Sequence, residues 1–418
     1  MFPLPAVVPP AGVLAAAPPA GTVLLAYTLA GCALGCCSGL VPGLHANNFA
    51  FLLAAAAPAL DAPPVPLGCA MVAAGVVHTF LDIVPSLALG VPDAAMAAAA
   101  LPGHRLVAEG RGREAMRLSA VGSGLALATA LPAAAVVTAG MRVAYPYLRA
   151  WLPVVLAGVA LLLVLTESNN RRRLAGALSF ALATALGLVT LDAPTDPLVA
   201  AGGVLAPLFA GLFGVPVLVD ALGGAGVPSQ ADARLGLSGR ELTGAAAAGA
   251  GGGAAVGYLP GVSAGVAAVL ALPATAGRDP AREYVVATSG ANTATAVFAL
   301  FAYWSFDATR SGVFVALDGA GVPAALPPLL SAVVVAGAVG TVAVVLVGDA
   351  ALRVVGGLPH APLVGGVIVG LALLSLAFAG PFGLGVLVAA AAVGFVPVRL
   401  GCRRVHLMGV LLGPLVIA

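Results

Sequence analysis

A series of apolar stretches, each about 17–25 residues long, constrains the fold of this chain more than any other feature. The stretches lack the strict alternation of apolar and polar residues that marks the strands of a membrane barrel. Lipid cannot satisfy backbone polar groups, so spanning segments of this kind must be helices. We therefore predict an all-α polytopic membrane protein of the cell membrane, with about 10–12 transmembrane helices.

Composition excludes most other classes of protein. Of the 418 residues, 61% are hydrophobic and 8% are charged, whereas soluble domains carry about 25% charged residues. A net charge of +2 gives no basis for binding nucleic acid. The five cysteines lie in or beside apolar segments, and no Cys/His set has the spacing of a zinc site. We therefore predict no metal, no cofactor and no nucleic-acid partner.

The chain divides into a leader and two membrane halves. We assign residues 1–19 to a Pro-rich N-terminal leader, 20–220 to a first membrane repeat and 241–418 to a second. Two apolar pieces, 44–60 and 262–274, are too short to cross the bilayer and follow Pro-Gly pairs, which is typical of re-entrant segments. The predicted spans are 20–41, 67–90, 113–139, 151–166, 172–191, 199–220, 241–259, 283–304, 323–347, 362–379 and 381–398.

Basic residues give the chain an orientation. Arginines cluster at 105–117, at 171–173 and at 399–404, and the positive-inside rule assigns such clusters to the cytoplasmic side. If the two halves are inverted, the counterpart of the first cluster, near 307–318, lies on the opposite side. His360 and His406 stand alone in the sequence and receive no predicted role.

An internal repeat supports the division into halves. The pattern G-x3-G-x3-G-x2-P-G occurs twice, and each residue of the second copy lies 218 positions after its counterpart. Small residues at every fourth position let helix backbones approach closely, which explains the glycines. The Pro-Gly pair instead ends a helix, because proline lacks a backbone N–H and glycine tolerates any φ. The two copies are Gly31, Gly35, Gly39, Pro42 and Gly43, and Gly249, Gly253, Gly257, Pro260 and Gly261.

Polar residues follow both breaks. His45, Asn47 and Asn48 come after the first break, and Ser263 takes the corresponding place after the second. Such residues cap helix starts, and the same helix starts bind anions through unpaired amides and the helix dipole. Capping and ligand binding are compatible, and both stay open. With no arginine in the re-entrant segments, we expect amides, His45 and dipoles to supply the positive potential.

A second polar group lies in the span that follows each break. His78 and Asp82 are four residues apart and share a helix face, and a buried charge of this kind is costly in lipid. Together with Thr79 they form either a structural pair or a coupling site for a proton or sodium ion. Asn292 and Thr293 hold the comparable place in the second half and are predicted to contact the substrate.

The motifs as a set resemble a known family. GLVPGL near the N-terminus, LGVPDAAMAAAALPGHRLVAEGRGREAMRLSAVGS at 89–123, GYLPGVSAG and SGANTATA resemble the large membrane subunit of the tripartite tricarboxylate transporters, and most closely its archaeal relatives of unassigned function. The resemblance implies two inverted repeats around a central anion site, and it extends to Pro42, Gly43, Pro260, Gly261 and Asn292. Family members commonly continue the first break as PGLGP, whereas this chain reads PGLHANN.

Three functions fit these features. The paired breaks favour an ion-coupled secondary permease for an organic anion, with the substrate bound between the repeats at the two Pro-Gly breaks. The alternative is a translocase of a polyprenyl-phosphate lipid, since such translocases resemble the same superfamily in their paired re-entrant segments. An intramembrane enzyme is the third and weakest, because no second acidic or Cys/His cluster accompanies His45, His78 and Asp82. A homodimer is compatible with each of the three.

Overall fold

The computed structural model describes residues 20–42, 44, 46–57, 62–90, 100–199, 203–223, 226–259, 262–271 and 279–417, in which all regular secondary structure is helical, as predicted. Seven of the described helices are long and apolar enough to cross a membrane, and three shorter apolar helices accompany them. The first half comprises α1 (Ala20–Gly39), α2 (Ala46–Ala56), α3 (Pro64–Leu81), α4 (Ile83–Leu89), α5 (Ala100–Ala108), α6 (Gly112–Ala150), α7 (Leu152–Leu165), α8 (Asn170–Thr190), α9 (Leu205–Phe209), η2 (Ala210–Gly214) and α10 (Val215–Ala221). The second comprises α11 (Gly239–Tyr258), α12 (Ala264–Ala271), α13 (Pro280–Phe306), α14 (Gly312–Gly319), α15 (Leu326–Gly357), α16 (His360–Leu400), η4 (Arg404–Met408) and α17 (Gly409–Ile417).

The two pieces that are too short to span form short helices, α2 and α12, within the predicted ranges. The predicted spans 362–379 and 381–398 meet in α16, where Gly380 has a non-helical backbone with φ 62° and ψ −158°. Pro381 lacks the amide that would bond the carbonyl of Ala377, and the amides of Leu198 and Val199 donate to that carbonyl instead. The interruption between those two predicted spans is thus confirmed.

Two helix ends and the C-terminal segment differ from the prediction. The helix predicted over 323–347 extends as α15 to Gly357. Residues 140–150, which separate two predicted spans, continue α6 as far as Ala150 despite Pro146, because proline is tolerated in membrane helices where neighbours satisfy the backbone. The C-terminal pair η4 and α17 was absent from the predicted spans, since the segment is short and begins with Arg404. It nevertheless packs against α7 and α8.

Glycines set the distance between the first and third helices of each half. A methyl group on Gly31 would lie 2.1 Å from the carbonyl oxygen of Ala70, and one on Gly249 would lie 2.5 Å from that of Ala287. Gly35 and Gly253 meet α3 and α13 in the same manner, one helical turn further on. The packing role predicted for these glycines is confirmed, and the halves use it alike.

Long helices of each half pack against helices of the other half. The long helix α6 packs on α11 and α13 of the second half, while α15 packs on α1 and α3 of the first. Near the ends of the halves, α8 packs against α17, and α16 packs against α9, η2 and α10. The resulting core mixes both halves throughout, so neither half encloses a core alone.

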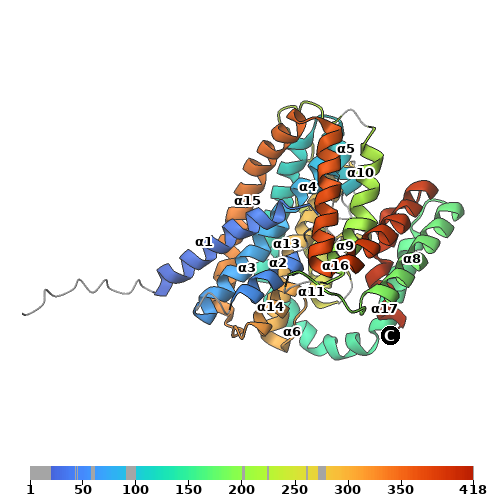
Figure 1. Cartoon of the computed structure of the whole chain (residues 1–418). Helices are drawn as coiled ribbons and strands as arrows, with labels where there is room; N and C mark the ends of the chain where they lie inside the picture. The colour runs from blue at the N-terminus through green and yellow to red at the C-terminus, as the bar shows by residue number, and fades with distance from the viewer. Residues whose placement is uncertain are drawn as a thin grey trace, which may run out of the picture.

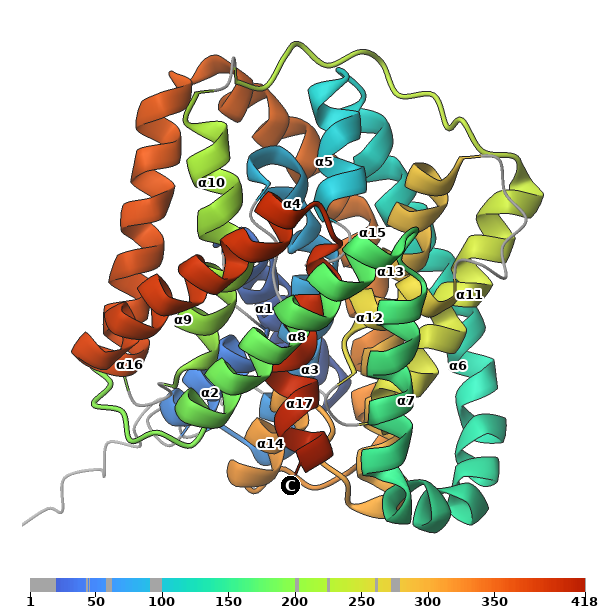
Figure 2. The ribbon, with the colours of Figure 1, turned by 90° about the vertical axis from the view of Figure 1, so that its right-hand side faces the viewer.

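Two short helices, α5 and α14, mark opposite ends of the molecule. Figures 1 and 2 show α5 near the top and α14 near the bottom in both views. The arginines of 105–117 lie at the α5 end, where Arg282 pairs with the buried Glu114 at 2.8 Å. Inversion of the halves requires such opposite placement of α5 and α14, and the inversion itself stays a prediction.

Substitution of two glycines in α11 should separate packing from helix propensity. Gly249→Ala should lower the melting temperature of the purified protein, since forcing a group into packed space costs about 1–3 kcal/mol. Gly251→Ala is the matched control, because nothing lies within 4 Å of its added methyl group, and alanine favours a helix by up to about 1 kcal/mol. Equal melting temperatures for the two variants would contradict the packing role.

Candidate functional site

A buried contact joins the two halves at the centre of the core. Asn292 on α13 donates through Nδ2 to Oδ2 of Asp82 at 2.7 Å, and the same nitrogen lies 3.4 Å from the carbonyl oxygen of Thr79. Asp82 is 2% exposed and sits at the junction of α3 and α4. The sequence placed HTFLD and NTATA at comparable positions, and the structure brings them into direct contact.

Hydroxyl groups extend this contact into a polar cluster. The hydroxyls of Thr79 and Thr293 are 3.4 Å apart, and Thr293 donates to the hydroxyl of Ser123 on α6 at 2.9 Å. Ser123 donates in turn to the carbonyl of Ser289 at 3.1 Å. On the other side of α3, Nδ1 of His78 lies 2.9 Å from the hydroxyl of Ser38. Four long helices thus meet through polar side chains, which satisfy one another away from water.

A cavity of about 230 Å³ lies beside this cluster. Its wall includes the first residue of α2, Ala46, and the start of α12, where Ser263 accepts a hydrogen bond from the amide of Val266 at 3.3 Å. Thr79 and Asn292 link the cavity to the polar cluster. Most of the remaining wall is apolar and comes from α3, α9, α11, α14, η4 and α17.

Only some of the predicted site residues lie within the described part of the structure. Gly43, His45, Pro260 and Gly261 lie outside the described residues, and so does the range 91–99. Asn47 and Asn48 belong to the first turn of α2, but their side chains also lie outside the description. Pro42 lines a different hollow. Ser263, Thr79 and Asn292 line the central cavity, whereas Thr293, His78 and Asp82 lie behind its wall.

Arg310 is a cavity residue that the sequence reasoning missed. It lies between α13 and α14, where its guanidinium carbon sits 5.0 Å from the ring centre of Tyr145. The expectation that amides, His45 and dipoles alone supply positive potential here is therefore wrong, because a guanidinium lies in the wall. A signal was present: Arg310 is the sole arginine or lysine between positions 282 and 353.

A larger apolar hollow of about 740 Å³ lies between the first break and α16. Val41 and Pro42 form one side, and the first part of α16 forms the other. Leu373 on that part of α16 is 61% exposed, so this side of the hollow reaches the outer surface of the bundle. The hollow thus differs from the central cavity in both chemistry and position.

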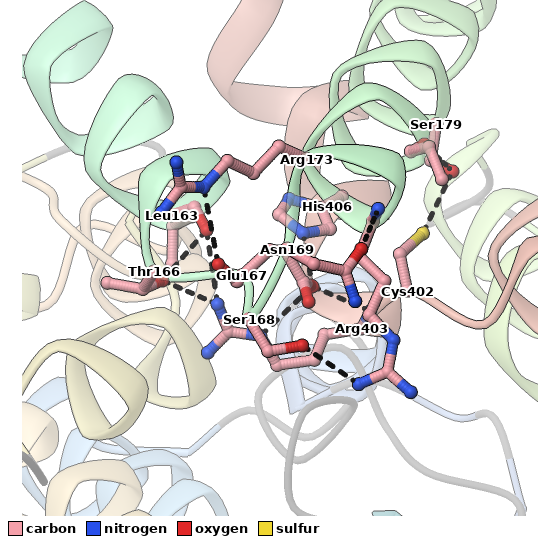
Figure 3. A network of polar contacts seen from close by, with 12 residues as sticks. Leu163, Thr166, Glu167, Ser168, Asn169, Arg173, Ser179, Cys402, Arg403 and His406 are labelled. Carbon is pink, nitrogen blue, oxygen red and sulfur yellow. Dashed lines mark hydrogen bonds and ion pairs between the residues drawn. The ribbon is translucent and has the colours of Figure 1, made fainter.

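A second polar network holds the C-terminal segment (Figure 3). Glu167, between α7 and α8, accepts hydrogen bonds through Oε1 from the amide of Arg403 at 2.9 Å, from its Nε at 3.1 Å and from Nε2 of His406 at 2.9 Å. Although burial opposes ionisation, these donors lower the pKa of Glu167. The expectation that His406 is solitary is wrong, and so is that for His360, whose Nε2 donates to the carbonyl of Ala221 at 2.7 Å.

This network fixes part of the cavity wall. Met408 and Leu411, which line the cavity, follow directly after the residues that bind Glu167. Within the described residues, no group of three or more His, Cys, Asp or Glu side chains is arranged to hold a metal ion. The polar residues of the site are instead suited to binding a small polar ligand by hydrogen bonds and charge.

Comparison with known proteins agrees with the resemblance found in the sequence motifs. The sequence model of the tripartite tricarboxylate transporter TctA family matches residues 25–409. An uncharacterized protein of Methanocaldococcus jannaschii is 29% identical over 203 residues, which are 47% of this chain and 48% of that protein. The chain thus matches about half the length of this relative. No solved structure matches it. The resemblance predicted from the motifs is confirmed.

The Glu167 network should contribute strongly to stability. Glu167→Ala should lower the melting temperature, since it leaves the buried His406 and the amide of Arg403 without their acceptor, and an unsatisfied buried donor costs about 1–3 kcal/mol. The control is Glu109→Ala, which breaks an exposed pair with Arg105 worth at most about 1 kcal/mol.

Acid should weaken this contribution. The lowered pKa means that the stabilisation by ionised Glu167 is complete above its ordinary value of 4.5 and is lost as the pH falls through the lowered pKa. The difference in melting temperature between the wild type and Glu167→Gln should therefore be largest above that pH and shrink in acid. A difference that grows on acidification would contradict the ionised state.

Proposed function

Because the chain belongs to the tripartite tricarboxylate transporter TctA family, we propose that it is a secondary permease which binds a small organic anion in its central cavity. The observation that carries the proposal is the composition of the cavity wall. It joins the starts of the two short helices that follow the repeated breaks with Asn292 and Arg310. Helix starts and a guanidinium both favour negative charge.

The position of the cavity between the halves suits a transporter. Its walls come from α3 of the first half and from α11, α12 and α13 of the second, so relative motion of the halves would alter it. Substrate sites between structural repeats are the common arrangement in secondary transporters. Ser263 and Asn292 supply hydroxyl and amide groups for the ligand, and the family likeness favours a carboxylate over other anions.

The apolar hollow beside Pro42 supports the second candidate, a translocase of a polyprenyl-phosphate lipid. A lipid carrier needs a lateral space for its chain, and this hollow lies against the outward-facing part of α16. In that case the isoprenoid chain would lie in the hollow, with its phosphate near the first break at Pro42. The two candidates differ in the ligand that purified protein retains.

We propose that the polar cluster of Asp82 and Asn292 couples transport to an ion. Asp82 is a carboxyl group buried at membrane depth, and it contacts Asn292, which also lines the cavity. Intramembrane carboxyl groups commonly bind a proton or a cation in coupled transporters. Through Asn292, the charge state of Asp82 can be sensed by a ligand in the cavity.

Uptake into proteoliposomes tests the permease. Wild-type protein should take up a radiolabelled carboxylate, and Ser263→Ala should reduce its affinity severalfold, because the variant removes a polar group from the cavity wall. Ser238→Ala is the matched control, since it removes the N-cap of α11 far from the cavity. Retention of geranyl phosphate without uptake of any carboxylate would favour the lipid translocase.

Coupling is tested at Asp82. Asp82→Asn preserves the size of the side chain and an acceptor for Asn292, but it cannot take up a proton or offer a charge. Uptake by the variant should no longer respond to an imposed proton or sodium gradient. Asp232→Asn, whose carboxyl side chain is 98% exposed, should behave like the wild type. An unchanged gradient response in Asp82→Asn would return the residue to a structural role.

A further inference from the structure

Arg310 lies in the cavity wall, and none of the described residues pairs with its charge. Its Nε is buried, and within the described part of the chain no hydrogen bond or ion pair reaches its side chain. Its one recorded contact is with the ring of Tyr145. A guanidinium has five donor hydrogens, and a ring face satisfies none of them by a conventional hydrogen bond.

Such an arrangement is unfavourable unless something else binds the charge. A contact with an aromatic face is weaker than the charge-assisted hydrogen bonds that a guanidinium forms with an anion. Arginines at membrane interfaces usually extend the charged group into water. Arg310 is half-buried: its Nε is enclosed, and its side chain lies in a wall that it shares with Ser263 and Asn292. The missing partner is therefore best sought in the cavity.

Aromatic packing holds the guanidinium in position. Tyr145 stacks on Phe306 with ring centres 5.4 Å apart, and Phe306 meets Tyr258 edge-on at 6.2 Å. The hydroxyl of Tyr258 lies 2.7 Å from that of Thr138, which anchors this row in α6 and α11. With one face covered by Tyr145, the edge of the guanidinium remains for a ligand. That edge matches the two oxygens of a carboxylate.

The charge and volume of the cavity further restrict the class of ligand that it can bind. Arg310 is the only charged side chain among the described residues of the wall, and most of the others are apolar. One fixed positive charge balances one negative charge, and each extra carboxylate would be desolvated without a partner. The volume of about 230 Å³ lies below the roughly 300–1,000 Å³ of sites for drug-sized ligands, which disfavours a long lipid chain.

We propose that Arg310 is the anion-recognition residue of the cavity, and that it selects a small monocarboxylate with an apolar carbon skeleton over di- and tricarboxylates. This inference rests on the proposed function and specifies its substrate class. One carboxylate binds the edge of the guanidinium, Tyr145 orients that edge, and the apolar wall contacts the carbon skeleton. Ser263 and Asn292 lie where they can bind a further oxygen atom of the ligand.

Calorimetric titration of the full chain in nanodiscs tests the proposal, with butyrate, succinate, citrate and geranyl phosphate as probes. Butyrate should bind most tightly. Arg310→Gln should weaken butyrate binding by about 30-fold or more, since loss of a charged partner costs at least about 2 kcal/mol. Arg310→Lys should show a smaller loss, because it retains the charge without the planar edge. Arg142→Gln removes an exposed arginine at the same end of the molecule and should bind butyrate like the wild type.

The outcomes separate this inference from the proposed function. If citrate binds most tightly, or if Arg310→Gln binds butyrate like the wild type, the inference is wrong while the permease proposal stands. If none of the anions binds to the wild type, the proposed function fails as well. Should Arg310→Gln not fold, phenylglyoxal labelling of the wild type decides: butyrate must protect Arg310 from modification and leave Arg142 reactive.

Discussion

The close contact between two pairs of helices, α1 with α3 and α11 with α13, sets the geometry on which the rest of the molecule depends. Glycines on α1 and α11 bring the backbones together until no methyl group fits between them. The contact continues along α3 to the carbonyl of His78 and along α13 to that of Ala291. Asp82 and Asn292 lie beside these positions, so the close packing at the glycines determines where Asp82 and Asn292 lie along their helices.

Packing of helices from one half against the other then brings the residues of the polar cluster together. Asp82 and Asn292 come from different halves, as do Ser123 and Thr293, and each pair is completed only when α3, α6 and α13 meet. In lipid such groups have no water to bond, so mutual satisfaction between the halves replaces it. The cavity lies beside this cluster because the short helices α2 and α12 end the close packing there.

Patterns that repeat along the chain were predictable from the sequence, and features that depend on long-range contacts were not. Apolar length and glycine spacing predicted the helices, the short segments and the packing of Gly31 and Gly249. The contact between Asp82 and Asn292 could be anticipated from their equivalent places in the two halves. Arg310 stands out in the sequence as a lone arginine, but its place in the cavity could not be assigned, because only the fold brings it into the same wall as Ser263. The pairing of Glu167 with His406 joins residues 239 positions apart and has no local signal.

Carbonyl groups at a helix break or helix end in one half accept hydrogen bonds from residues of the other half. The amides of Leu198 and Gly203, before α9, bond the carbonyls of Ala377 and Phe378 at the break in α16. Arg403, before α17, donates to the carbonyl of Leu163 at the end of α7. During synthesis, therefore, the first half enters the bilayer long before the residues that complete α7 have left the ribosome. The amides of Leu198 and Gly203 likewise gain these partners only once α16 has been made, so the segment before α9 reaches its final contacts after the second half has entered the bilayer.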